Sequence, residues 1–165
     1  MADLAKLTGA GMLDDQIWPS SIPAMSPAAI GKVRQLESLA SEQPQLPIVT
    51  EHTIHAGLYS RTIRLQAGTM ITGALIKKAT LLIVAGDALA YIGEDAPLRL
   101  QGYAVLPCSA NRKQIFIAIE PTTLTMVLPT QAKTVEEIEA EWTDEADLLI
   151  SRRDPDANRI TVTGE

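Results

Sequence analysis

The feature that most constrains this chain is a series of short, β-prone runs between Thr62 and Pro129, broken by Gly and Pro. Some runs alternate apolar with polar residues and others are continuously apolar, which is typical of strands covered on one face or on both. About eight such strands, separated by regularly spaced turn residues, indicate an all-β sandwich or barrel. The expected strands cover residues 61–65, 69–76, 80–84, 88–92, 98–100, 103–106, 115–119 and 124–128.

The segments on either side of the β-rich region show helical signals. Ser26 followed by Pro27 combines a capping hydroxyl with proline at the first helical position, and Pro44 ends this helix. Thr134 and Glu137 form a capping box that starts a second helix. The faces expected to be buried are Ile30, Val33, Leu36 and Leu39 or Ala40 in the first helix, and Val135, Ile138 and Trp142 in the second.

The chain therefore divides into three consecutive parts. We expect an N-terminal arm and helix over residues 1–50, a β-barrel over 51–130, and a C-terminal helix with a polar tail over 131–165. Trp18 and Ile22 are the residues with which the arm could pack on a neighbouring surface.

Composition and charge exclude several classes of function. The chain has 165 residues, of which 46% are hydrophobic, enough for one domain with a core. A net charge of −6 and an aromatic content of 4% do not suit binding to duplex or single-stranded nucleic acid. Cys108 is the single cysteine, which fits a reducing compartment. The N-terminus does not resemble a signal peptide and no apolar run is long enough to span a bilayer, so we expect a cytoplasmic protein without membrane partners.

The glycines and prolines of the β-rich region resemble the motifs of the cupin superfamily over roughly residues 55–130. Gly68 and Gly86 match the two ends of the family's first motif, and the stretch 107–112, which begins with a proline, is similar to the second. The resemblance implies a mainly β fold: a cupin-like jelly-roll barrel of about eight strands with flanking N-terminal and C-terminal helices.

Cupins hold a metal ion with two closely spaced histidines, a carboxylate and a third histidine, and the same resemblance locates those positions here. Ala74, Ile76, either Ala79 or Thr80, and Arg112 stand at them. These side chains are not the imidazole and carboxylate ligands that transition metals prefer. The resemblance therefore implies a barrel that keeps the architecture without the catalytic residues, cofactor or metal of the family.

A second resemblance is to small cupin-fold proteins encoded in the genomes of tailed phages. It rests on the segments Thr50–Gly57, Thr72–Lys77 and Leu148–Arg153. It implies a virion-associated or assembly role, with other phage structural proteins as partners, and possible incorporation into a virion.

The two histidines are candidate metal ligands. His52 and His55 are three residues apart, next to Glu51. A helix would place both imidazoles on one side, whereas a strand points residues three apart to opposite faces, and the segment favours a strand. A third ligand would have to come from Glu51, Glu120 or Cys108, so hydrogen-bonded histidines at a strand entrance or subunit contact are the simpler interpretation.

Arginines give a second candidate cluster. Arg61 and Arg64, beside Tyr59, could bind a carboxylate or phosphate, and Arg112 could join Arg61 at the mouth of the barrel. The alternative is that these arginines form ion pairs on the outer strand face. The candidate ligand or contact cluster is thus His52, His55, Tyr59, Arg61 and Arg112.

Two other features have a simpler interpretation than a reactive site. Cys108 would need a nearby base or cation to become a nucleophile, and a small semi-buried residue in a barrel loop is the commoner case. The acidic helix could be mistaken for a carboxylate cluster that binds metal, but its charges are expected to form a solvated face away from Val135, Ile138 and Trp142. Its glutamates are Glu136, Glu137, Glu139, Glu141 and Glu145.

Two functions from different classes follow. The first is a non-enzymatic barrel that acts as a homo-oligomeric structural or interaction protein, because the flanking segments have apolar faces that a second copy could cover. The alternative is a small-molecule binder or metal-dependent enzyme with a relocated site at the mouth of the barrel.

Overall fold

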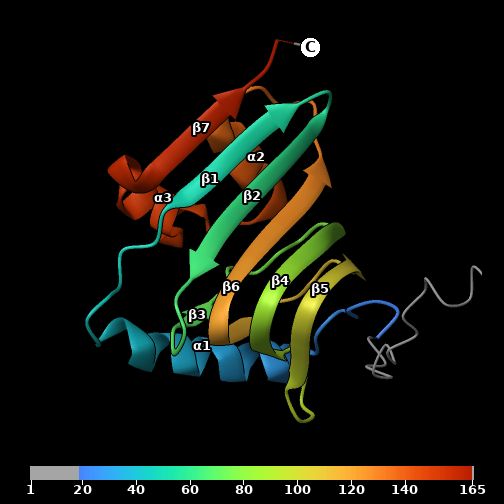
Figure 1. Cartoon of the computed structure of the whole chain (residues 1–165), viewed down its shortest axis with the longest axis vertical. Coiled ribbons are helices and arrows are strands. Elements are labelled where there is room, and N and C mark those ends of the chain that lie inside the picture. Colours follow the sequence, from blue (N-terminus) through green and yellow to red (C-terminus); the bar gives the residue numbers. More distant parts are fainter. Residues whose placement is uncertain (1–18, 165) are drawn as a thin grey trace, which may run out of the picture.

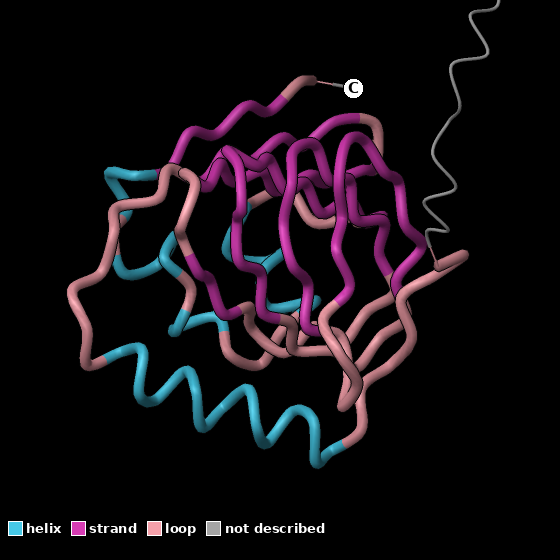
Figure 2. Tube along the Cα trace, turned by 60° about the horizontal axis from the view of Figure 1, so that its bottom comes forward, coloured by secondary structure: helices cyan, strands magenta, loops and turns pink. Residues whose placement is uncertain are grey.

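The computed structural model describes residues 19–164, so Trp18 and the arm before it lie outside the described residues. One curved, seven-stranded sheet forms the body of the molecule (Figures 1 and 2). The mainly β fold class with flanking helices is confirmed. The strands are β1 Thr50–His55, β2 Leu58–Leu65, β3 Met70–Thr72, β4 Thr80–Tyr91, β5 Leu98–Cys108, β6 Ile115–Pro129 and β7 Asn158–Val162.

The strand order in the sheet is β5-β4-β6-β2-β1-β7, and β3 pairs with the first half of β6. All pairs are antiparallel except β1 with β7, which is parallel. The helical elements are α1 Pro27–Ser41, α2 Val135–Trp142 and α3 Ile150–Arg153, with short 3₁₀ turns η2 Ala146–Leu148 and η3 Pro155–Ala157. In Figure 1, α2 and α3 lie behind the sheet and α1 runs across its lower end.

The eight predicted strands correspond to five, β2 to β6, because three of the predicted turns lie within strands. The predicted strand 69–76 is shorter in the structure, where β3 covers only Met70–Thr72. At Gly86 (φ 141°) the pairing of β4 with β6 shifts register, so the chain bends without leaving the sheet. Gly102 (φ 89°) lies inside β5, whose pairing with β4 continues through it, and Pro121 lies inside β6. Glycine marks a bulge or bend as often as a turn, which sequence alone does not distinguish.

Both predicted helix starts are confirmed. The Ser26 side chain accepts a hydrogen bond from the Ala29 N–H, and Thr134 accepts one from the Glu137 N–H. Val33 of α1 is buried as expected, and so are Val135, Ile138 and Trp142 of α2. Leu39, by contrast, is 63% exposed.

The prediction that the C-terminal residues form only a polar tail is wrong. Residues 158–162 form β7, which extends the sheet beside β1. The prediction assigns the β-prone piece from Ile160 to Thr163 to the tail. Four of the five strand residues are exposed, so hydrophobic burial does not hold this strand. Backbone pairing and the Asn158 side chain hold it instead.

The interior contains two principal hydrophobic clusters. One fills the curved half of the sheet and includes Leu82, Val84, Leu106 and Phe116. The other lies between β1, β2, β6 and the helix α2. None of the described helices is long and apolar enough to cross a membrane.

Candidate functional site

A cavity of about 160 Å³ lies where the sheet meets α2 and the turns that follow it. Its walls are mostly apolar, as is usual for small-molecule sites. The apolar side chains include Ile63, Ile71, Leu82, Phe116, Leu124 and Met126. Five residues bring polar groups to its wall besides Glu37 and Thr72: Thr50, Arg61, Arg112, Gln114 and Trp142.

Arg112 is the unusual member of this wall. It is only 1% exposed. Its guanidinium donates to Gln114 Oε1 at 3.2 Å and to the Lys78 carbonyl at 3.3 Å, and also to the Ser109 carbonyl and Thr80 Oγ1. Every one of these acceptors is uncharged, and burial lowers the pKa of Arg112. Arg112 is therefore a buried cation with no carboxylate among its hydrogen-bond partners.

Three buried polar side-chain atoms in residues 19–164 have no hydrogen-bond partner, and all three belong to residues that line this cavity. They are Thr50 Oγ1, Gln114 Nε2 and Trp142 Nε1. The orientation of the Gln114 amide is fixed, because arginine only donates and must face Oε1. Gln114 and Trp142 therefore offer unused N–H donors. Buried polar groups are nearly always paired, so this coincidence calls for a cause.

The side chains at this place do not suit a transition metal. Ala74, Ile76 and Arg112, which the cupin resemblance aligns with metal ligands, do come together at the cavity. Ile76 N–H donates to the Arg112 carbonyl at 2.8 Å. Across the described part of the chain, however, no three His, Cys, Asp or Glu side chains are grouped closely enough to hold a metal ion.

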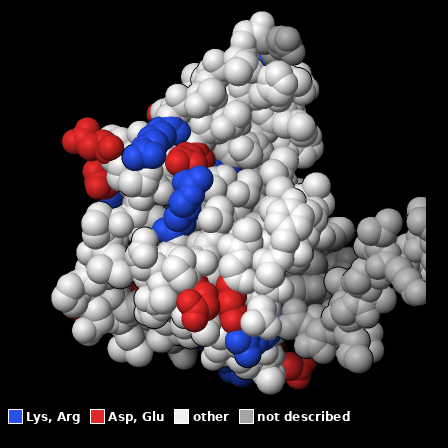
Figure 3. Space-filling view, in the orientation of Figure 1, with Lys and Arg blue, Asp and Glu red and all other residues white. Residues whose placement is uncertain are grey.

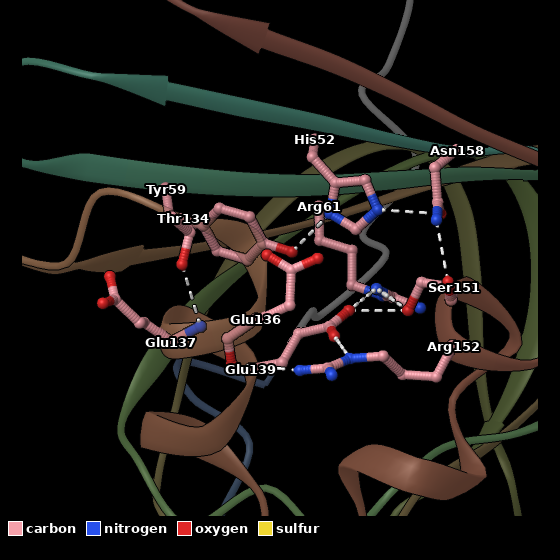
Figure 4. Close-up of polar contacts among 10 residues, drawn as sticks. All are labelled: His52, Tyr59, Arg61, Thr134, Glu136, Glu137, Glu139, Ser151, Arg152 and Asn158. Atoms are coloured by element: carbon pink, nitrogen blue, oxygen red, sulfur yellow. Dashed lines mark hydrogen bonds and ion pairs between the residues drawn. The ribbon is translucent and has the colours of Figure 1, made fainter. Parts of the chain in front are cut away.

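Of the predicted cluster, His52, Tyr59 and Arg61 lie together in a buried polar network (Figure 4). Asn158 Nδ2 donates to the Ser151 carbonyl at 2.7 Å, so its Oδ1 must face His52 Nε2, 3.2 Å away. His52 Nε2 therefore carries the proton, and Nδ1 accepts from the Tyr59 hydroxyl at 2.7 Å. Burial lowers the pKa of His52 and raises the pKa of Tyr59 to about 12, so both stay neutral near pH 7. The network is satisfied internally and holds β7 to β1.

His55 and Arg112 do not join this network. His55 points to the opposite face of β1, as expected for a strand, and its Nδ1 lies 2.5 Å from the hydroxyl of Thr163. Arg112 and Arg61 have only the wall of the cavity in common. The five candidates thus divide into a structural network, a surface contact and a shared cavity.

The prediction that the glutamates of the acidic helix form a solvated face is wrong at two positions. Glu139 is fully buried, and its carboxylate accepts from Arg61 at 3.0 Å, from Ser151 at 2.6 Å and from Arg152. It lies next to Ile138 on the helix, and the cations that pull it inward come from β2 and α3, far away in sequence. Glu139 thus shares its carboxylate between two arginines, of which Arg61 also lines the cavity.

Glu145 is the second exception, because its side chain is only 15% exposed. It accepts from the Lys113 ammonium at 2.7 Å, from Arg34 at 2.9 Å and from the Leu75 N–H at 2.8 Å. Although burial opposes ionisation, these donors hold the pKa of Glu145 below its usual value. The pair with Lys113, which is 0% exposed, ties the 3₁₀ turn η2 to the β-sheet and leaves Glu145 fully engaged.

Cys108 has the environment of a structural residue. It is buried, and its thiol donates to the Leu106 carbonyl at 3.3 Å. Burial raises the pKa of Cys108, although the nearby Arg112 opposes the rise. A raised pKa disfavours the thiolate that a nucleophile needs.

Solved structures similar to this chain include cupins. A cupin superfamily protein from Desulfitobacterium hafniense has a TM-score of 0.44 at 14% identity, covering 56% of this chain and 88% of its own. An RmlC-like cupin from Methanocaldococcus jannaschii, with a double-stranded β-helix fold, has a TM-score of 0.44 at 14% identity, covering 53% of this chain and 85% of its own. KdgF from a Halomonas species has a TM-score of 0.43 at 13% identity, covering 55% of this chain and 86% of its own. No family model matches the chain, and no curated protein does. The likeness is one of fold and says nothing of activity.

Proposed function

We propose that this protein is a non-enzymatic binding protein with a cupin-like fold, and that the cavity beside Arg112 takes a small organic anion with a compact apolar body. One observation carries the proposal. A buried arginine with only neutral hydrogen-bond partners lines the same apolar cavity as three residues that each have one unpartnered polar side-chain atom.

The charges near the cavity support an anionic ligand. Arg112 has only neutral acceptors, and Arg61 shares the single carboxylate of Glu139 with Arg152. Glu37, the acidic residue on the wall, is paired with Lys113. A carboxylate in the cavity would neutralise a buried cation and could accept from the unused N–H groups of Gln114 and Trp142, and charge-assisted hydrogen bonds of this kind are among the strongest in proteins.

The non-enzymatic part rests on the reactive groups near the cavity. His52 uses both ring nitrogens inside the protein, and Cys108 is buried with a raised pKa. Neither is poised as a general base or nucleophile. The remaining polar groups on the wall bind and orient a ligand.

Calorimetric titration with benzoate, which approaches the cavity in size, tests the proposal. We expect saturable binding to the wild-type protein and a loss of at least about tenfold in affinity in Arg112→Met, because the cation is removed. Arg64→Met is the matched control: Arg64 is exposed and pairs with Glu51 on the sheet surface, so its loss should leave binding unchanged. Circular dichroism establishes that each variant is folded.

Equal binding by wild type and a folded Arg112→Met variant would refute the anion site. The metalloenzyme alternative has its own measurement, elemental analysis of the purified protein. Stoichiometric zinc, iron, nickel or manganese that disappears in a His52→Ala/His55→Ala double variant would replace our proposal with that alternative.

Self-association is a second candidate function, favoured by an uncharged outer face. Leu81, Tyr103 and Val105 are exposed on the outside of β4 and β5, with Tyr103 at 70%. Ile83 pairs with Val105 and Ala85 with Tyr103 across these strands, so their side chains are contiguous. In Figure 3, charged groups lie at the upper left, left of the centre and across the lower part of the view, and the surface right of the centre is without them. Contiguous apolar patches commonly mark interfaces.

Light scattering after size exclusion tests association. We expect a homo-oligomer in the wild type and dissociation in Val105→Asp, whereas Val162→Asp, on β7 outside this face, should keep the oligomer. A monomeric wild-type protein would remove this candidate. A phage virion role would need such contacts with other proteins and stays a prediction.

A further inference from the structure

The cavity beside Arg112 is smaller than most ligand sites. Its volume of about 160 Å³ is close to that of a cavity that accommodates a single benzene molecule, and ligand pockets usually exceed about 300 Å³. An anionic head with a few carbon atoms would fill it. Any larger ligand must extend beyond it.

A groove of about 670 Å³ adjoins this cavity. It lies between α1, the segment that follows α1, β3 and the η2–α3 turn. The two spaces share wall residues and are therefore adjacent. The shared residues are Glu37, Ile71, Thr72, Leu148 and Ile150.

Exposed apolar side chains gather in this groove. Leu39 is 63% exposed, Leu46 61%, Leu148 49% and Met70 38%, and all four line it. They come from four different segments, so their convergence is a property of the fold. Leu39 was one of two residues, with Ala40, expected to complete the buried face of α1, and its exposure leaves it available at this wall. Exposed apolar clusters of this kind usually have an occupant.

The polarity of the two spaces sets the orientation of a ligand. The residues with unpartnered N–H donors line the cavity, together with Arg112 and its neutral acceptors, whereas the four exposed apolar side chains line the groove. On the basis of the proposed anion site, we infer that the ligand is an amphipathic carboxylate of the fatty-acid class. Its head lies beside Arg112 and its hydrocarbon chain lies in the groove beneath α1.

Calorimetric titration with butanoate, octanoate and dodecanoate, below micelle-forming concentrations, tests this inference. We expect affinity to rise with chain length, with dodecanoate at least about tenfold tighter than butanoate, because each buried methylene adds to binding. Dodecylammonium, which has the same chain and the opposite charge, should not bind.

A variant separates the groove from the cavity. Leu39→Gln/Leu46→Gln changes two exposed residues, so the fold should persist, and we expect dodecanoate to weaken about tenfold while butanoate is unchanged. Leu58→Gln is the matched control, because Leu58 is 49% exposed and lies on β2 away from both spaces. Arg112→Met should weaken all three carboxylates.

The outcomes distinguish the two proposals. Equal affinities for butanoate and dodecanoate would overturn the amphipathic ligand and leave the anion site standing. No binding of any carboxylate would end both. Chain-dependent binding that ignores Arg112→Met would overturn the orientation, and a wild-type oligomer that Leu39→Gln/Leu46→Gln dissociates would show that a second copy covers the groove instead.

Discussion

At the scale of single residues, several side chains on the cavity wall lower the free energy of unfolding. An unpartnered buried hydroxyl costs about 1–3 kcal/mol, and a buried cation without a carboxylate adds to that cost. Thr50, Gln114 and Arg112 carry these costs on one wall. Proteins tolerate such costs mostly where a ligand recovers them.

Thr50→Val tests this trade directly, because valine keeps the shape and removes only the hydroxyl. We expect the free energy of unfolding in denaturant to rise by about 1 kcal/mol and the affinity for benzoate to fall. Thr62→Val is the control, since the Thr62 hydroxyl is paired with Thr125 at 2.8 Å and its loss should not stabilise the protein. An unchanged or lowered stability in Thr50→Val would contradict the assignment.

His52 makes folding sensitive to pH. Its pKa is lowered from 6.5 in the folded state, first by burial and then by Arg61, so the unfolded chain binds the proton more readily. The contribution of His52 to stability is complete above the unfolded pKa and declines as pH falls from 6.5 toward the lowered folded value.

We therefore expect the free energy of unfolding to decrease between about pH 7 and pH 5, above the range in which carboxylates titrate. In His52→Gln this slope should flatten, while His55→Gln should keep it. Denaturation midpoints at several pH values provide the measurement. A slope that persists in folded His52→Gln would assign it to another group.

At the scale of elements, the bulge in β4 decides the curvature of the sheet. A Cβ at Gly86 would lie 2.6 Å from the Pro121 carbonyl oxygen and 2.7 Å from Thr122 Cα. The backbones of β4 and β6 thus approach closely at the point where the pairing shifts register.

Gly86→Ala should lower the free energy of unfolding by about 3 kcal/mol, because it combines overpacking with an unfavourable positive φ. Gly102→Ala is the matched comparison. It also has positive φ, at 89°, but nothing within 4 Å of the added atom, so a cost of only about 1 kcal/mol is expected. Chemical denaturation of both variants compares them, and equal costs would mean that the close approach is unimportant.

At the scale of the whole molecule, the C-terminal segment closes the structure by returning to β1. Glu139 and Ser151 engage Arg61, and Asn158 engages His52, so α2, α3 and β7 are all fixed to two adjacent strands (Figure 4). The same segment supplies Trp142 and Leu149 to the cavity wall. The site therefore exists only when the C-terminal segment is in place.

Deleting residues 155–165 should lower the free energy of unfolding by about 1–3 kcal/mol, since the chain loses the ladder of β7 and the Asn158 bonds. It should also increase association, because the edge of β1 becomes unpaired. Thermal melts and light scattering of the shortened and full chains measure both effects. Unchanged stability would mean that β7 does not hold the fold.

The sequence by itself determined the β-rich body, both helix starts and the histidines on opposite faces of one strand, because these depend on local periodicity and capping. It also indicated Arg61 and Arg112 as candidates for one anion pocket. Only the tertiary structure decided that Glu139 is buried, that residues 158–162 form a strand, and that Thr50, Gln114 and Trp142 share a cavity with Arg112. Those features depend on charge pairs and close approaches between residues far apart in the chain, which local pattern does not encode.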